Sequence, residues 1–249
     1  MDPYELFVRW YLRFNGFLSV ENFVVHEPDP QLPNVPAGTE SDTLAVRFPH
    51  SKEIPGDGYA LNVKLINDEK LLDEEAIAKG LTDFVIAEVK SGQNKSLNKV
   101  WTAPDPDERY VAQVEYLVRW LGASGDEAAI REIARCLRKE YRCLHGQYLF
   151  RLVYFSDTPY QFATTKKIRQ LTFRDVANFF VEDRISCWQR NGLGARSFHG
   201  QWHPLIKKVW ELGGDEEVPP DRRIESILEL LQTVKANGQP DKDLLPLPS

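Results

Sequence analysis

The sequence predicts an α/β protein, with a mixed sheet flanked by helices and a helical C-terminal extension. Two observations lead to this fold class. Up to residue 157, segments with apolar residues at helical spacing alternate with short apolar runs typical of strands. From Thr172 onward only helical spacing recurs, at residues 173–180 and 224–231. The content of 42% hydrophobic and 27% charged residues is typical of a globular protein rather than a disordered or disulfide-built one.

The first elements are predicted to be a helix, a strand, a loop and a second strand. Apolar residues recur at helical spacing over residues 2–15, and Gly16 supplies a stop. Residues 17–26 predict a strand that leads into a proline-rich loop, and residues 42–48 predict a second strand with Asp42 at its entrance. Residues 49–82 are polar and turn-rich, so we expect an insertion there with one short helix near its end.

Two further strands on either side of a helix pair are expected to complete the sheet. Residues 83–90 are apolar on both faces through Ala87, as in a strand covered by helices on each side. Residues 107–121 and 126–139 predict amphipathic helices, and residues 148–155 predict another buried strand. We therefore expect a core at residues 1–157, a helical subdomain at 158–236 and a flexible tail at 237–249.

Charge and cysteine content argue against several classes of protein. A net charge of −6 argues against a surface coated with positive charge for unspecific nucleic-acid binding, but it leaves room for a local basic cleft. Cys136, Cys143 and Cys187 are an odd, widely spaced set without a C-x-x-C pair, so we expect a cytoplasmic protein without a disulfide framework. No apolar run approaches the ~18 residues of a membrane span, and the first residues lack an export signal, so no membrane association is expected.

Glu88 and Lys90 form the strongest local signal for chemistry. Strand alternation points both side chains to the same face at the end of an apolar strand. A carboxylate there can ligate Mg²⁺, and a neighbouring lysine can orient or help deprotonate a water and stabilise charge on phosphorus. The alternative is a solvated strand end with a paired Glu and Lys.

Asp42 offers a second carboxylate on the preceding predicted strand. A Mg²⁺ site built on two adjacent strands needs such a pair, because hard cations prefer oxygen ligands. Glu40 has the same strand parity as Asp42 and is a candidate helper. An alternative with equal weight is that Asp42 and its neighbours are simply the polar start of a strand that follows a loop.

These residues and their order resemble the PD-(D/E)XK nuclease superfamily, with its restriction-endonuclease-like fold. The resemblance covers about residues 1 to 155, and Ser41 stands where many members have a proline. The opening YELFVRWYLRFNGF is similar to archaeal Holliday-junction resolvases and their bacterial relatives, in which a helix glutamate completes the acidic cluster; Glu5 is the matching residue. The resemblance implies that Glu5, Asp42 and Glu88 hold Mg²⁺ or Mn²⁺ while Lys90 assists the attacking water.

Further residues are candidates for nucleic-acid contact. Gln113 lies where RecB-like nucleases carry a glutamine, with a spacing that differs by one residue from the usual one, and Gln93 lies in the polar turn after Lys90. A basic stripe at helical spacing is formed by Arg131, Arg135, Arg138 and Arg142. Lys95 adds charge in a loop, and Trp101 is a candidate for base stacking or for the core. The alternative is that these arginines are ordinary solvent-exposed residues on the surface of a helix.

The function expected from the sequence is that of a metal-dependent endonuclease hydrolysing phosphodiester bonds in DNA. Defence against foreign DNA or DNA repair would follow by analogy, with a homodimer or a partner protein as open alternatives. The rival hypothesis is a catalytically inactive scaffold of the same fold that binds a protein or nucleic acid. The complete set of two acids and Glu-x-Lys favours the nuclease, since a scaffold has no need to retain it.

Overall fold

The computed structural model describes residues 2–25, 39–49, 67–92, 96–103, 108–122, 125–159, 168–190 and 202–237. Contacts divide the chain into two units. The sheet unit contains residues 17–51 and 72–170, and the helical unit contains residues 1–16, 52–71 and 171–249. This grouping differs from the predicted one, because the first helix groups with the C-terminal helices rather than with the strands.

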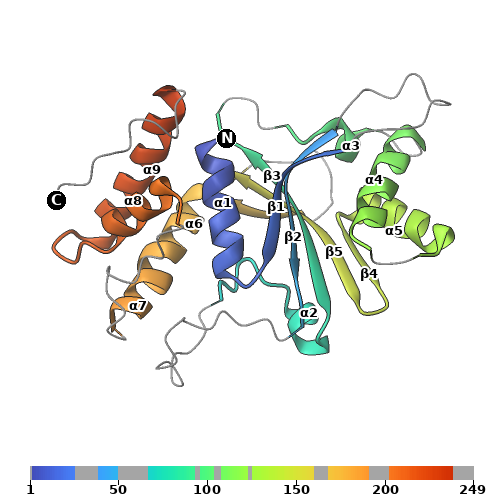
Figure 1. Cartoon of the computed structure of the whole chain (residues 1–249), viewed down its shortest axis with the longest axis horizontal. Helices are drawn as coiled ribbons and strands as arrows, with labels where there is room; N and C mark the ends of the chain where they lie inside the picture. The colour runs from blue at the N-terminus through green and yellow to red at the C-terminus, as the bar shows by residue number, and fades with distance from the viewer. Residues whose placement is uncertain are drawn as a thin grey trace. The chain divides into compact units, whose positions relative to one another are not determined.

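Within the described residues the strands form one sheet of six (Figure 1). Their directions are mixed, as predicted. In chain order they are β1 (Leu18–Val25), β2 (Thr39–Arg47), β3 (Thr82–Lys90), β4 (Arg142–His145), β5 (Tyr148–Ser156) and β6 (Arg169–Thr172). The order in the sheet is β1-β2-β3-β5-β4, and β6 pairs with β5. The pair β3–β5 is parallel, whereas β1–β2, β2–β3 and β4–β5 are antiparallel. The general α/β class is therefore confirmed.

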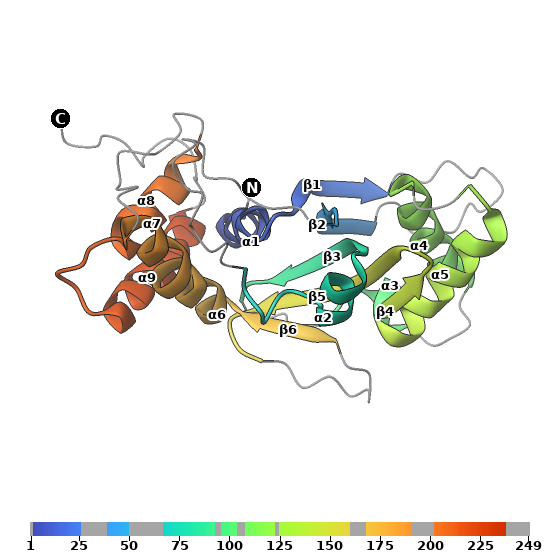
Figure 2. The same ribbon diagram turned by 90° about the horizontal axis from the view of Figure 1, so that it is seen from below.

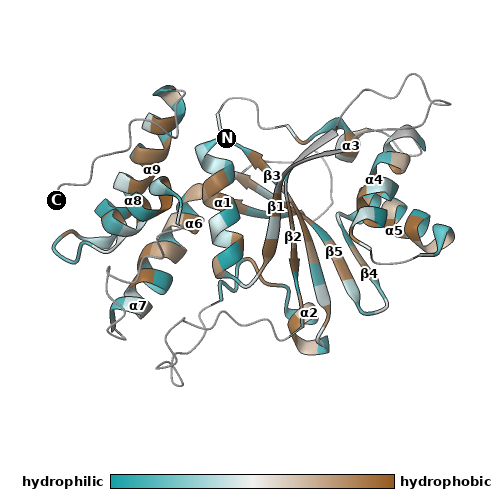
Figure 3. Ribbon diagram, viewed as in Figure 1, coloured by the Kyte–Doolittle hydropathy of each residue, from teal (hydrophilic) through white to brown (hydrophobic). Residues whose placement is uncertain are grey.

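Helices lie on both faces of this sheet (Figure 2). On one face, α3 (Lys99–Thr102), α4 (Glu108–Trp120) and α5 (Glu127–Glu140) share a core with even-numbered strand residues such as Phe84, Ile86 and Leu152. On the other face, α2 (Glu74–Lys79) packs through Ala76 against Leu149. Both α4 and α5 show apolar and polar sides, which fits helices that cover a sheet (Figure 3).

A left-handed residue separates α5 from β4. Tyr141 has a φ of 57° and caps the helix, so Arg142 begins a strand instead of continuing the predicted basic stripe. Arg142 binds Asp73 and Glu75 at the start of α2. The strand β4 escaped prediction because four residues are too few to show alternation. A turn with Gly146 at a φ of 58° then returns the chain into β5.

The helical unit contains the first helix and the C-terminal helices. They are α1 (Pro3–Phe14), α6 (Phe173–Asn178), the π-helix η1 (Phe179–Ile185), α7 (Ser186–Arg190), α8 (Pro204–Gly213) and α9 (Pro220–Asn237). Aromatic rings join α1 to the following segments, with Tyr4 against Phe173 and Phe7 against Phe180. The predicted helices around residues 173–180 and 224–231 are confirmed. Within the described ranges, none of the helices is long and apolar enough to cross a membrane.

Candidate functional site

The ladder between β2 and β3 brings Asp42 and Glu88 together. Its last bonded pair is Thr43 with Ala87, so Asp42 and Glu88 continue the same antiparallel register. The backbone N–H of Val89 donates to Asp42 Oδ2 at 2.6 Å. Asp42 lies inside β2 rather than at its entrance, because β2 begins at Thr39 and pairs with β1 up to that residue. The predicted pairing of two carboxylates on adjacent strands therefore matches the geometry.

Lys90 joins both carboxylates on the same face of the sheet. Its Nζ lies 3.0 Å from Glu88 Oε2 and 3.6 Å from Asp42 Oδ2. Strand alternation accounts for the first contact, since Glu88 and Lys90 are two residues apart. The side chains of Lys90 and Asp42 are 24% and 17% exposed, whereas that of Glu88 is only 2% exposed. Solvent therefore reaches the group through Lys90 and Asp42.

The surroundings of Glu88 shift the pKa of its carboxyl group in opposing directions. Its burial raises its pKa above the ordinary value, and the nearby Asp42 adds to this effect, while Lys90 and the indole of Trp101 oppose it. Trp101 Nε1 donates to Glu88 Oε1 at 3.1 Å. The two oxygens of Glu88 thus have different donors, Trp101 for Oε1 and Lys90 for Oε2.

Lys90 is held in its charged form by the two acids. Burial by itself lowers the pKa of Lys90, but the charges and hydrogen bonds of Glu88 and Asp42 outweigh it and raise the pKa above the ordinary value. An ammonium group can stabilise negative charge or orient a water molecule, whereas it cannot accept a proton. The arrangement therefore favours an electrostatic role for Lys90 over that of a general base.

Two further acids, Glu5 and Glu40, were predicted to join this group. Glu5 lies half-buried in the first turn of α1, which belongs to the helical unit, so its predicted meeting with Asp42 stays a prediction. Glu40 is part of β2, but its side chain lies outside the described residues. Within the ranges that the structure describes, no cluster of three or more His, Cys, Asp or Glu side chains is placed to hold a metal ion.

The donor types of this pair nevertheless fit a hard divalent cation. Asp42 and Glu88 offer carboxylate oxygens, which Mg²⁺ prefers, and the two side chains already surround one positive group, the ammonium of Lys90. Mg²⁺ commonly uses one or two carboxylates and keeps several waters, so two acids are enough in number.

Gln113 is buried on α4 at 5% exposure. Among the residues that the structure describes, none donates a hydrogen bond to its Oε1. A buried amide oxygen without a donor is uncommon in proteins, so Gln113 is well suited to meet a ligand or a water molecule. Gln93 and Lys95, the two predicted contacts in the turn after β3, lie outside the described residues.

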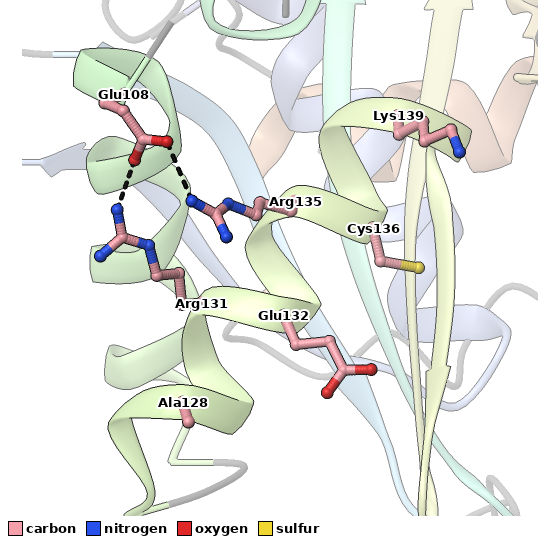
Figure 4. A pocket seen from close by; sticks show the side chains of 7 residues that line it. All are labelled: Glu108, Ala128, Arg131, Glu132, Arg135, Cys136 and Lys139. Atoms are coloured by element: carbon pink, nitrogen blue, oxygen red, sulfur yellow. Dashed lines mark hydrogen bonds and ion pairs between the residues drawn. The ribbon is translucent and has the colours of Figure 1, made fainter. Parts of the chain in front are cut away.

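The predicted arginine stripe on α5 has two different environments. Arg131 and Arg135 are exposed and both bind Glu108 of α4, at 2.6 and 2.9 Å (Figure 4). They line an open groove of about 710 Å³ that also contains Lys139 and Glu132. Arg138 is instead buried at 3% exposure and donates to backbone carbonyls, so its guanidinium is used in packing and does not fit the predicted contact with nucleic acid.

Two polar contacts were not found by sequence reasoning. The hydrogen bond from Trp101 to Glu88 depends on where the short helix α3 lies, which local periodicity does not report. On the opposite face, Arg151 forms a buried ion pair with Asp83 at 2.7 Å. The signal for this pair was an arginine within the apolar run YLFRLVYF, since a charge in a buried strand requires a partner.

No family model matches the chain, and neither the curated proteins nor the solved structures contain a match.

Proposed function

We propose that this protein is a Mg²⁺-dependent nuclease with a restriction-endonuclease-like fold that hydrolyses phosphodiester bonds in DNA. The observation that carries the proposal is the convergence of Asp42, Glu88 and Lys90 on one face of two adjacent strands. The mixed sheet with helices on both faces, and the resemblance noted for the sequence, support the same assignment.

Each residue has a role that follows from its surroundings. Asp42 and Glu88 would hold Mg²⁺ or Mn²⁺, which would supply Lewis-acid polarisation of the phosphate and a more acidic bound water. Lys90, as a charged ammonium that is partly open to solvent, stabilises the negative charge that develops on the phosphate oxygens. Trp101 and the backbone N–H of Val89 keep the two carboxylates in place. Glu5 remains the candidate third acid.

The second candidate function, a binding scaffold, is favoured by one observation. Lys90 already bonds both carboxylates, so the three groups satisfy one another as a structural ion cluster. In a scaffold this cluster needs no metal and no substrate. Metal dependence therefore separates the two functions.

A cleavage assay tests the proposal. Supercoiled plasmid, linear duplex and single-stranded DNA are incubated with the wild type and with Lys90→Ala, in Mg²⁺, in Mn²⁺ and in EDTA. Lys208→Ala is the matched control, since this exposed lysine pairs with Glu211 in the helical unit. We expect cleavage by the wild type and the control, and none by Lys90→Ala or in EDTA. Absence of cleavage on every substrate would favour the scaffold.

A further inference from the structure

Trp101 contacts the most deeply buried acid of the site. Its Nε1–H donates to Glu88 Oε1 at 3.1 Å, opposite the contact of Lys90 with Oε2 at 3.0 Å. With a different donor at each oxygen, the carboxylate plane of Glu88 is restrained. A hydrogen bond to a charged acceptor is stronger than one between neutral groups, and burial increases its effect.

The helix that carries Trp101 is too short to be stable without support. The helix α3 has only four residues, Lys99–Thr102, and is capped by the side chain of Asn98, which accepts from the N–H of Val100. Isolated helices of this length do not persist in water, and their last carbonyls lack intrahelical partners. The position of the Trp101 indole therefore depends on contacts from elsewhere in the fold.

Two side chains at the end of α5 supply these contacts. Arg138 donates from Nε to the carbonyl of Val100 at 3.0 Å and from Nη2 to the carbonyl of Ala103 at 3.1 Å. The hydroxyl of Tyr141 donates to the carbonyl of Trp101 at 3.3 Å. Two carbonyls of α3 and that of Ala103, the residue that follows it, are thus bonded by one short stretch of chain. Both donors are buried, so water does not easily replace them.

The backbone at Tyr141 is consistent with such a role. Tyr141 is the residue with a positive φ, 57°, among the non-glycine residues that the structure describes. A bulky residue in this conformation carries a local energetic cost, which is tolerated where the surrounding structure requires it. Here the conformation ends α5 and directs the ring toward α3, where its hydroxyl reaches Trp101.

We propose that Trp101 is a positioning residue for Glu88, and that Arg138 and Tyr141 hold the short helix from which Trp101 reaches it. This inference rests on the proposed function, in which Glu88 is a metal ligand. Trp101 is buried and acts through Glu88. Its role is to present Glu88 in one orientation, so that metal binding does not have to restrict the carboxylate.

The first experiment tests the contact without any metal. The indole N–H signal of Trp101 is assigned in a ¹H–¹⁵N spectrum by its loss in Trp101→Phe, and its hydrogen exchange is measured. We expect slow exchange in the wild type, and an upfield shift with faster exchange in Glu88→Ala. Tyr141→Phe, which removes a single hydroxyl, is expected to speed the exchange by a smaller factor. An indole signal that is unchanged in Glu88→Ala would overturn the inference.

The second experiment measures the consequence for the site. Mn²⁺ is titrated calorimetrically into the wild type, Trp101→Phe and the control Trp120→Phe, whose ring is 52% exposed on α4. We expect the Kd for Mn²⁺ to weaken by up to about tenfold in Trp101→Phe, because metal binding then has to immobilise the Glu88 side chain itself. The control is expected to keep its affinity. Metal-free melting temperatures are recorded alongside, so that general destabilisation is separated from a change at the site.

The outcomes distinguish this inference from the proposed function. Equal Mn²⁺ affinity in the wild type and in Trp101→Phe would overturn the positioning role, even if the enzyme cleaves DNA. No Mn²⁺ binding by the wild type would remove the proposed function, while the indole signal would still decide whether Trp101 orients Glu88. If Trp101→Phe does not fold, Tyr141→Phe replaces it, and we expect a smaller loss of Mn²⁺ affinity in this variant. An unchanged affinity in Tyr141→Phe would then count against the inference.

Discussion

The side chain of Asp42 accepts a hydrogen bond of 2.6 Å from the backbone N–H of Val89, the residue between Glu88 and Lys90. One carboxylate of the site is therefore bonded to the strand that carries the other two groups. In Asp42→Ala the partly buried N–H of Val89 loses this acceptor, whereas Asp42→Asn retains an oxygen there. We expect Asp42→Ala to be less stable than Asp42→Asn by about 1–3 kcal/mol. Urea unfolding in EDTA measures the difference, and equal midpoints would contradict this account of the bond.

The ion pair between Asp83 and Arg151 is expected to respond very differently to single and double replacement. Both side chains are almost fully buried, so Asp83→Ala removes the carboxylate that binds the buried guanidinium of Arg151 and is expected to destabilise the fold by about 3–5 kcal/mol. The double variant Asp83→Leu, Arg151→Met removes both charges and is expected to be markedly more stable than Asp83→Ala. Chemical denaturation of the wild type, Asp83→Ala and the double variant tests this. A double variant that is no more stable than Asp83→Ala would argue against coupling between the two charges.

The stability contributed by Asp73 is expected to disappear in acid. Burial raises the pKa of Asp73, but the hydrogen bonds from Arg142 and from the N–H of Ala76 outweigh it, so the net pKa lies below the ordinary value. A carboxyl group with a depressed folded-state pKa stabilises the fold above its unfolded pKa, and this contribution is lost as the pH falls through the folded value. We expect Asp73→Asn to cost about 0.5–1 kcal/mol at neutral pH. The cost should vanish well below the ordinary aspartate pKa, and a gap independent of pH would refute the assignment.

Glu108 is expected to restrain DNA binding by the groove beside α5. It pairs with Arg131 and Arg135, two of the predicted nucleic-acid contacts. Glu108→Gln would remove this carboxylate from both guanidinium groups and leave Arg131 with Glu115, at 3.5 Å. We expect DNA affinity to increase roughly two- to fivefold, in line with the weakness of exposed ion pairs. Glu132→Gln, in the same groove, changes the net charge equally and is the control. Fluorescence anisotropy in EDTA over a salt series measures this, and equal gains in both variants would point to net charge alone.

Sequence periodicity predicted the parts of the site that depend on local geometry. The two-residue alternation of a strand placed Glu88 and Lys90 on one face, and the apolar runs located β3 and β5. Contacts between distant segments were beyond this reasoning. The hydrogen bond from Trp101 to Glu88 and the burial of Arg138 both depend on the placement of α3 against α5, which no local pattern encodes. Likewise, helical spacing showed the arginines but not that Glu108 lies across from them.

The most direct test of the central claim is whether Asp42 and Glu88 form one metal site. Calorimetric titration of Mn²⁺ compares the wild type with Asp42→Asn and Glu88→Gln, which remove one charge each with little change of shape. The account predicts a single saturable site in the wild type and loss of that site in both variants. Binding that is unchanged in the variants, or absent in the wild type, would contradict it.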